Sequence, residues 1–323
     1  MTDKTNRLIL DTDGGVDDAQ ALLMLIAAGR TPFAISTVFG NVSLDHATAN
    51  MVAILTLAGV DAPVHAGADR PLNAPMIHAR EIHGEEGLGG AARPLTDSTP
   101  ASDDAVTFLR DTLRDAAATG DLVDVLMIGP LTNLALALRV APDCIGGIGR
   151  LTLMGGSIHG RGNVTPAAEF NIYADPEAAG IVFGAEIDIV VVPWETCVAH
   201  SITGDAVDAL FGALPPGREK EFSESLAGHA RRVIAGFGHG DLFRFVDPLA
   251  AAVVVEPEII TRSLRASVDV ALAPGLTRGM TVVDPSGRLG TPMVTLVEEV
   301  DRDRLIALFQ ASIAHRVSGE GKP

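Results

Sequence analysis

Hydrophobic and polar positions along this chain form blocks that predict strands and helices in turn. Short apolar runs bounded by glycine or polar residues predict strands, and longer segments with helical spacing predict helices. The predicted strands are Arg7–Leu10, Phe33–Phe39, Pro63–Gly67, Leu122–Ile128, Leu151–Met154, Ile187–Val192, Ser267–Ala271, Met280–Val283 and Met293–Glu298. The predicted helices are Ala19–Ala28, Asp45–Ala58, Ser102–Ala118, one after Asn133, one starting at Asp175, residues 204–235, one after Asp247, and Arg302–Val317. Residues 69–100, rich in Gly, Pro and charge, predict a loop.

This alternation of strands and helices is typical of a mainly parallel sheet flanked by helices. No internal repeat, low-complexity tract or linker interrupts the 323 residues. We therefore expect a single α/β domain over residues 1–323, with a Rossmann-like sheet. The active site is expected at the carboxyl ends of the strands.

The densest group of polar residues lies between the first predicted strand and helix. Asp11, Asp13, Asp17 and Asp18 fall within eight residues, and the segments on both sides are almost wholly apolar. A helix N-terminus stabilises one carboxylate by only about 0.3–1 kcal/mol, which cannot offset four anions at the end of a buried strand. Such a group raises its own pKa values or binds a cation, and oxygen ligands suit Ca²⁺ or Mg²⁺. The array therefore predicts a divalent metal site.

Three other interpretations of the array fit less well. Helix capping explains one aspartate, such as Asp17, but not four. An EF-hand loop starting at Asp11 would need Asp or Asn where Gly15 stands and Gly where Val16 stands. A phosphatase of the haloacid dehalogenase type would want Thr or Val in place of Gly15 and a lysine near the phosphate, but the chain has only three lysines.

Further polar or aromatic side chains follow other predicted strands or lie in loops. Asn41 follows the second strand, where it is either a ligand-binding residue or a turn residue. His83 lies in a glycine-rich loop that is either a mobile lid or plain surface. Trp194, at the end of a strand, either stacks on a flat ligand or packs in the core. Asp247, before Pro248, is an N-cap or a fifth carboxylate for the metal.

A third group of polar residues, Asn163, Glu169 and Asn171, occupies an irregular stretch. Because Glu169 and Asn171 are two residues apart, an extended backbone would point both side chains the same way. That arrangement suits hydrogen bonds to a polyol. Loops rich in Asn are common, so this stretch alone does not predict a sugar site.

Composition narrows the class of protein. With a formal net charge of −17, the chain offers no basic cluster for nucleic acid. It has no run of about 18 apolar residues for a membrane span, and its N-terminus leads directly into a strand, which argues against a signal peptide. Cys144 and Cys197 have no metal-site spacing and are expected to be buried thiols. We therefore expect a cytoplasmic protein without nucleic-acid or membrane partners.

Taken in order, the motifs resemble those of the nucleoside hydrolase family, of the inosine–uridine preferring type. The signature D-x-D-x-G-x-D-D stands here as Asp11 to Asp18. Gly40-Asn41, Gly129 to Asn133, Asn163 to Asn171 and Asp247-Pro248 follow in the family's order. The resemblance extends from Leu8 to about Leu249.

The resemblance implies Ca²⁺-dependent hydrolysis of the N-glycosidic bond of a small-molecule ribonucleoside to free base and ribose. Asp17 would be the general base on a calcium-bound water, with Asp11 behind the metal ligands. The metal ligands would be Asp13, Asp18, Asp247 and the backbone carbonyl of Ile128. The residues that hold the ribose hydroxyls would be Asn41, Asn163, Glu169 and Asn171. Family members are commonly homodimers or homotetramers, which is the assembly expected here.

The sequence departs from the family pattern in three places. Gly14 stands where Pro is frequent, which we expect to change the loop only slightly. Val246 stands where many members have a His that protonates the leaving base, and the surroundings of Trp194 differ as well. His83 lies where some relatives carry a useful His, and stacking of the base on Trp194 would be a substitute for an acid.

Other residues and other substrates stay open. His239 and Arg244 are close to Asp247 in sequence, which does not place them in the site. Two alternatives therefore stand beside the ribonucleoside hydrolase. One is a hydrolase of another N-riboside, such as nicotinamide riboside or a modified nucleoside, and the other is a nucleoside-binding protein without catalysis.

Overall fold

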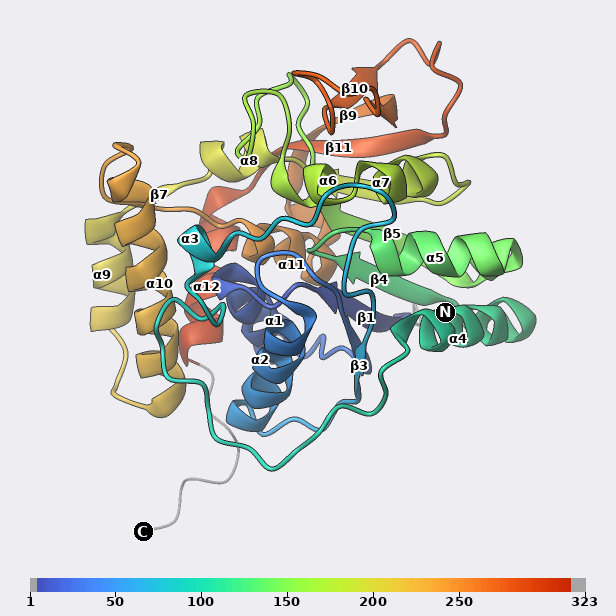
Figure 1. Cartoon of the computed structure of the whole chain (residues 1–323). Coiled ribbons are helices and arrows are strands. Elements are labelled where there is room, and N and C mark those ends of the chain that lie inside the picture. The colour runs from blue at the N-terminus through green and yellow to red at the C-terminus, as the bar shows by residue number, and fades with distance from the viewer. Residues whose placement is uncertain (1–4, 315–323) are drawn as a thin grey trace.

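The protein contains a central nine-stranded sheet (Figure 1). The structure is a computed structural model that describes residues 5–314. The strand order is β10-β9-β11-β6-β5-β4-β1-β2-β3. Neighbours from β3 to β11 are parallel, whereas β9 pairs antiparallel with both β11 and β10. The strands are β1 (Arg7–Thr12), β2 (Ala34–Thr37), β3 (Val64–Ala66), β4 (Val123–Met127), β5 (Ile148–Met154), β6 (Ile189–Val192), β9 (Ile260–Val270), β10 (Thr281–Asp284) and β11 (Met293–Val300).

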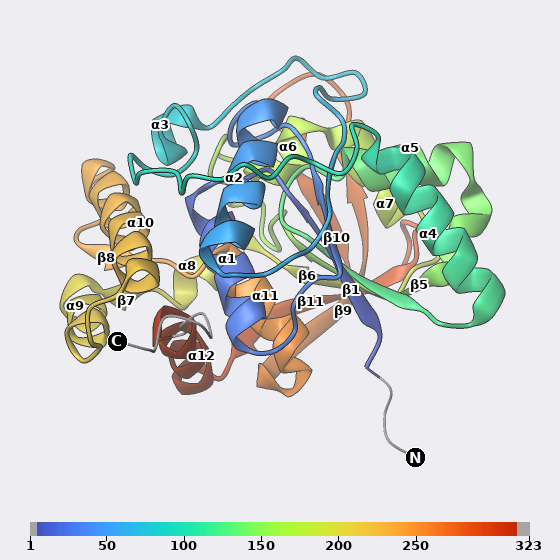
Figure 2. The ribbon, with the colours of Figure 1, turned by 90° about the horizontal axis from the view of Figure 1, so that it is seen from below.

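Helices cover both faces of this sheet (Figures 1 and 2). They are α1 (Val16–Ala27), α2 (Leu44–Leu57), α3 (Arg80–His83), α4 (Ala105–Thr119), α5 (Thr132–Val140), α6 (Phe170–Ala174), α7 (Pro176–Phe183), α8 (Trp194–Ala199), α9 (Gly204–Gly212), α10 (Arg218–Gly236), α11 (Asp247–Val255) and α12 (Arg302–Ala314). Two 3₁₀ helices span Pro142–Gly147 and Pro257–Ile259, and β7 (Ile202–Thr203) pairs antiparallel with β8 (Leu242–Phe243) in a separate two-stranded sheet.

The predicted α/β fold with a mainly parallel sheet is confirmed, and most strands lie within a few residues of their predicted bounds. One prediction is wrong: residues 204–235 form α9 and α10 rather than one helix, because the adjacent Pro215 and Pro216 cannot continue it. β9 begins at Ile260, well before the predicted Ser267, since its first half is polar and forms by pairing with β11. The end of the predicted helix Arg302–Val317 lies outside the described residues.

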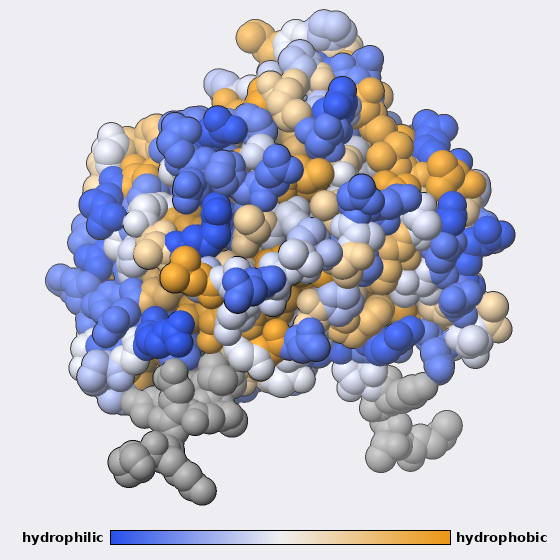
Figure 3. All heavy atoms as spheres, turned by 60° about the horizontal axis from the view of Figure 1, so that its bottom comes forward, coloured by the Kyte–Doolittle hydropathy of each residue, from blue (hydrophilic) through white to orange (hydrophobic). Residues whose placement is uncertain are grey.

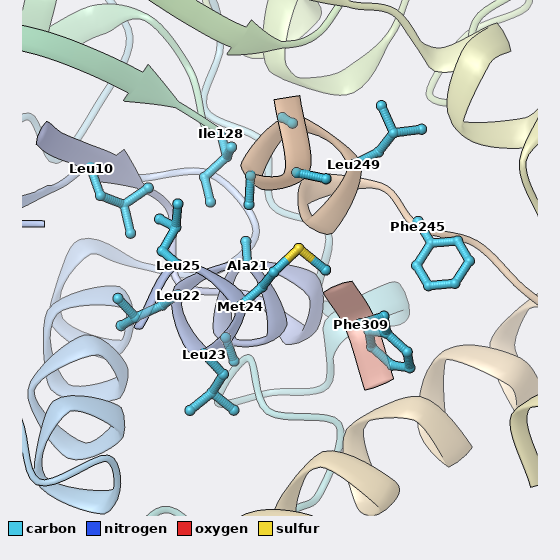
Figure 4. Close-up of a cluster of buried hydrophobic side chains, with 14 of the residues drawn as sticks. Leu10, Ala21, Leu22, Leu23, Met24, Leu25, Ile128, Phe245, Leu249 and Phe309 are labelled. Carbon is cyan, nitrogen blue, oxygen red and sulfur yellow. The ribbon is translucent and has the colours of Figure 1, made fainter. Parts of the chain in front are cut away.

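The core lies in two layers, one on each side of the sheet. Along β1, Leu8 and Leu10 belong to the cluster under α1 and α11, whereas Ile9 belongs to the cluster under α4, α5 and α7. This alternation is the expected result of a strand period of two. Helix α1 packs between the sheet, α11 and α12, with its leucines directed to all sides (Figure 4). Each fully buried leucine side chain stabilises the folded state by roughly 1.5–3 kcal/mol. This packing fixes the position of α1 and of the aspartates at its start.

On the face drawn in Figure 3, hydrophilic and hydrophobic residues are interspersed. Among residues 5–314, no helix is both long and apolar enough to cross a membrane.

Candidate metal and substrate site

The predicted site residues gather at the carboxyl ends of the central strands. Asp13 follows β1, Asn41 follows β2 and Ile128 follows β4, and these strands are parallel neighbours. Asp247 comes from far along the chain, at the start of α11, which packs against α1. The parallel sheet brings these ends to one edge, as the sequence predicted.

Three carboxylates converge at this edge. One oxygen from each of Asp17, Asp18 and Asp247 lies within 4.8 Å of the other two. Asp18 and Asp247 are buried, and the side chain of Asp17 is 20% exposed. Asp17 and Asp18 occupy the first turn of α1, as predicted, because Gly15 ends the turn after β1. The interpretation of Asp247 as an N-cap is wrong: Val246 is the N-cap, and Asp247 is the first helical residue.

Asn41 ties a fourth carboxylate to this group. Its backbone N–H donates to Asp13 Oδ2 over 2.7 Å, and its Nδ2 donates to Asp13 Oδ1 over 2.9 Å and to Asp18 Oδ2 over 3.0 Å. Asp18 also accepts from the hydroxyl of Thr12 and from the Gly15 N–H. Sequence reasoning passed over Thr12, although it stands between the first two aspartates of the signature.

The acidic cluster has no cationic side chain to balance it. Among the described residues, no Lys or Arg forms an ion pair with Asp13, Asp17, Asp18 or Asp247. Burial and the neighbouring carboxylates raise the pKa of Asp13 and Asp247, and burial raises the pKa of Asp17 to about 6. Asp17 Oδ1 is buried without a hydrogen-bond partner. Crowded oxygen donors with unmet charge fit a hard divalent cation.

His83 lies beside the cluster at the end of α3. Its Nδ1 accepts a hydrogen bond of 3.1 Å from the Val16 N–H and lies 3.6 Å from Asp17 Oδ1. Burial lowers the pKa of His83 to about 4, so the ring is neutral at pH 7. His229 Nε2 bonds the Ile82 carbonyl over 2.8 Å, which docks α3 on α10, and Figures 1 and 2 show these helices side by side. The predicted loop therefore carries a docked helical turn at this point.

Glu169 and Asn171 also reach the site edge, but not from extended backbone as predicted. Asn171 lies in α6, and Glu169 is the N-cap of that helix, accepting from the Asn171 N–H over 2.9 Å. Asn171 Nδ2 donates to the carbonyls of Ile128 (3.3 Å) and Met154 (3.1 Å). Burial raises the pKa of Glu169 to about 7 despite the backbone N–H groups that it accepts. Polar caps begin this helix, and the sequence pattern gave no periodic signal for it.

Two predicted residues stand slightly apart from this buried group. Asn163 is exposed, and its Oδ1 accepts from the Phe170 N–H over 2.8 Å, which holds the preceding loop. Asp11 lies behind the site, where Asn133 Nδ2 donates to it over 2.8 Å, and burial raises its pKa to about 7. Support of the metal ligands by Asp11 stays a prediction.

Trp194 is the first residue of α8, just after β6, and is half-buried. Its backbone N–H donates to the Gly156 carbonyl over 3.0 Å. The Arg244 guanidinium lies 5.3 Å from the centre of the indole ring.

Gly14 lies in a left-handed turn between β1 and α1. Its φ is +71°, a value that proline cannot adopt. A Cβ at this position would lie 2.4 Å from the Cα of Ala47. Asn50 Nδ2 donates to the Gly14 carbonyl over 2.8 Å and so fixes the turn. The turn between β1 and α1 therefore follows a path that is closed to a proline.

Comparisons with known proteins agree with this geometry. A family model described as inosine-uridine preferring nucleoside hydrolase matches residues 8–307. The chain is 39% identical over 298 residues to the non-specific ribonucleoside hydrolase RihC of Salmonella enteritidis PT4, and the match covers 91% of this chain and 94% of the relative.

Solved structures of nucleoside hydrolases are also similar to this chain. The plant nucleoside hydrolase PpNRh1 has a TM-score of 0.89 and 29% identity, with 97% of this chain and 100% of the other covered. An inosine–guanosine nucleoside hydrolase has a TM-score of 0.86 and 27% identity, with 96% and 99% covered. The resemblance inferred from the motifs is thus confirmed, and the chain belongs to the inosine–uridine preferring nucleoside hydrolase family, whose members are glycosidases.

Proposed function

We propose that this enzyme hydrolyses the N-glycosidic bond of ribonucleosides, to free base and ribose, in a Ca²⁺-dependent reaction. The observation that carries the proposal is the convergence of the Asp17, Asp18 and Asp247 carboxylates within 4.8 Å, without a cationic partner among the described residues. The relatives named as ribonucleoside hydrolases support the substrate class.

The donor set supports calcium. Asp13, Asp18, Asp247 and the backbone carbonyl of Ile128 would hold the ion. Three carboxylates and a carbonyl suit Ca²⁺ better than Mg²⁺, which usually takes one or two carboxylates and keeps several waters. When bound, the ion orients the ribose hydroxyls and the attacking water and lowers the pKa of that water.

Asp17 is the proposed general base. Its Oδ1 is buried without a hydrogen-bond partner and is thus free to accept a proton. The water oxygen bonds to the anomeric carbon, and the proton of the water passes to Asp17. The electron pair of the N-glycosidic bond leaves with the nucleobase. The surrounding carboxylates stabilise the positive charge that develops on the ribose.

The proposed ribose-binding residues are Asn41, Asn163, Glu169 and Asn171. Three of them are buried at the site edge and already fixed by hydrogen bonds, so they are preorganised for the sugar hydroxyls. Asn163, which is exposed, would contact the sugar from the loop that it holds. Trp194 would stack on the base.

We also propose that residues 1–323 form a single domain and that the protein is a homodimer or homotetramer in the cytoplasm. The family resemblance supports the assembly. Both cysteines, Cys144 and Cys197, are free and buried, which suits a reducing compartment.

Ribose release from a nucleoside panel tests the function. We expect release from one or several common ribonucleosides, lost after prolonged chelation and restored by Ca²⁺. Activity only on nicotinamide riboside or a modified nucleoside would show that the enzyme is a hydrolase of that other N-riboside. Tight binding by calorimetry without product would instead indicate a nucleoside-binding protein.

A further inference from the structure

The Arg244 guanidinium is a charge without a matched partner. Arg244 is half-buried, and its Nε is buried without a hydrogen-bond partner. Among residues 5–314, no carboxylate lies within ion-pair distance of it, and its defined neighbour is the Trp194 ring, 5.3 Å away. Other partly buried arginines of this chain are paired, such as Arg278 with Glu177 at 2.7 Å. An unpaired, partly desolvated guanidinium is costly to keep, which points to an absent ligand.

Two chains of contacts connect this Arg244–Trp194 pair to the proposed site. The backbone N–H of Trp194 donates to the Gly156 carbonyl, and the backbone N–H of Gly156 donates to Glu169 Oε2 over 2.9 Å. On the other side, the Cys197 thiol of α8 lies 3.8 Å from the Val246 carbonyl, directly before Asp247. Helix α8, which carries Trp194, is therefore linked to a residue proposed to hold ribose and to the residue before a proposed metal ligand, and Arg244 interacts electrostatically with Cys197 of the same helix.

On the basis of the proposed function, we propose that Arg244, held by Trp194, contacts the leaving base and stabilises its negative charge. Arginine stays protonated at any working pH, so it donates hydrogen bonds but does not give up a proton. The electron pair of the N-glycosidic bond passes to the base, which departs as an anion paired with the guanidinium and then takes a proton from water. No residue has to act as a general acid at Val246.

The chemistry of the guanidinium defines the substrates that it favours. Its donors match a base with a carbonyl oxygen beside a ring nitrogen, since such a base spreads its negative charge onto acceptors. Uracil, hypoxanthine and xanthine have this arrangement. We therefore infer that Arg244 contributes more to the hydrolysis of nucleosides with these oxo-bases than to the hydrolysis of adenosine.

The test compares two kinds of leaving group. Uridine and inosine need help to release the base, whereas p-nitrophenyl β-D-ribofuranoside releases an already stable anion. We expect Arg244→Ala to lower kcat/KM by about 10²–10³-fold on the nucleosides and to change it little on the p-nitrophenyl riboside, with Arg244→Lys in between. Arg7→Ala is the matched control, because Arg7 also stacks on an aromatic ring, Phe33 at 4.4 Å, at the amino end of β1.

The outcomes separate this inference from the proposed function. Equal losses on both kinds of substrate, or no loss on either, in Arg244→Ala would overturn the role of Arg244 while the hydrolase stands. A loss of kcat/KM in Arg244→Ala that is as large on adenosine as on uridine and inosine would overturn the match of Arg244 to oxo-bases. Failure of the wild type to release ribose from any riboside would overturn the proposed function, and this inference with it. A melting temperature equal to wild type shows that any loss is not due to unfolding.

Discussion

The Nδ1 atom of His83 lies 3.6 Å from Oδ1 of Asp17 but takes its hydrogen bond from the backbone N–H of Val16. Because Nδ1 is the acceptor, the proton of the neutral imidazole is on Nε2. His83 therefore holds the first turn of α1, on which Asp17 is the second residue. The geometry therefore indicates that His83 positions Asp17, the proposed general base, rather than exchanging a proton with it.

Replacing Asp17 tests the general base. We expect Asp17→Asn to lower kcat by about 10²–10⁴-fold, because an amide cannot accept the proton of water. Ribose release gives the rate, and the melting temperature shows that the fold survives. Asp111→Asn, at an exposed carboxylate paired with Arg110, is the control and should be fully active. Wild-type turnover in Asp17→Asn would exclude Asp17 as the base.

Two replacements of His83 separate positioning from acid catalysis. The side-chain oxygen of asparagine can accept from Val16 where Nδ1 does, whereas His83→Ala leaves that buried donor unpaired, at a cost of about 1–3 kcal/mol. If His83 positions α1, asparagine should restore much of the kcat that alanine loses. If its Nε2 proton serves the leaving base, asparagine and alanine should be equally slow. Steady-state kinetics on inosine decides between them.

Metal binding should appear in stability as well as in rate. A ligand at about 100 times its Kd stabilises the folded state by about 2.7 kcal/mol. We expect Ca²⁺ to raise the melting temperature of chelator-treated protein, more strongly than Mg²⁺ at equal concentration. Asp247→Asn should weaken this response, and Asp143→Asn, on the surface, should leave it intact. Equal responses in wild type and Asp247→Asn would remove Asp247 from the ligand set.

The strand–turn–helix unit shows how much of the site the sequence could predict. Its aspartates fall within eight residues, and strand and helix periodicity predicted their place at the end of β1. Asp247 was predicted either to cap a helix or to provide a further carboxylate for the metal, and the order of the motifs favoured the metal site. Arg244 and Thr12 were not assigned a place, because their positions depend on α8 and on side-chain packing that no local pattern encodes. The short α6 was missed because its five residues are too few to show a helical period, although it buries Ile172 and Ala174 and is capped by the carboxylate of Glu169.

Glu169 should make stability depend on pH. Burial raises its pKa from 4.5 to about 7, so the folded state binds more protons than the unfolded state between these values. The contribution to the free energy of unfolding is therefore full below about pH 4.5 and is lost as pH rises through 7, by about 3 kcal/mol at most. We expect the difference in unfolding free energy between wild type and Glu169→Gln to shift against wild type from pH 5 to pH 8. Urea unfolding at equal Ca²⁺ concentration measures it, and a difference that is constant with pH would show that Glu169 titrates normally.

Gly14→Pro introduces the residue that is frequent in the family, yet we expect it to be harmful here. Proline requires a φ near −65°, whereas Gly14 has +71°, and any Cβ would lie 2.4 Å from Ala47 Cα. The turn must then move, which displaces Asp13 and Asp18 on either side of it and breaks the bond from Asn50 to the Gly14 carbonyl. Both the melting temperature and the apparent affinity for Ca²⁺ should fall, and Gly14→Ala should cause a smaller loss because it keeps the backbone N–H. Gly212→Ala is the control, since a Cβ there meets no neighbour within 4 Å and the residue is helical. If Gly14→Pro kept wild-type stability and calcium affinity, the left-handed turn after β1 would not be the conformation that the site requires.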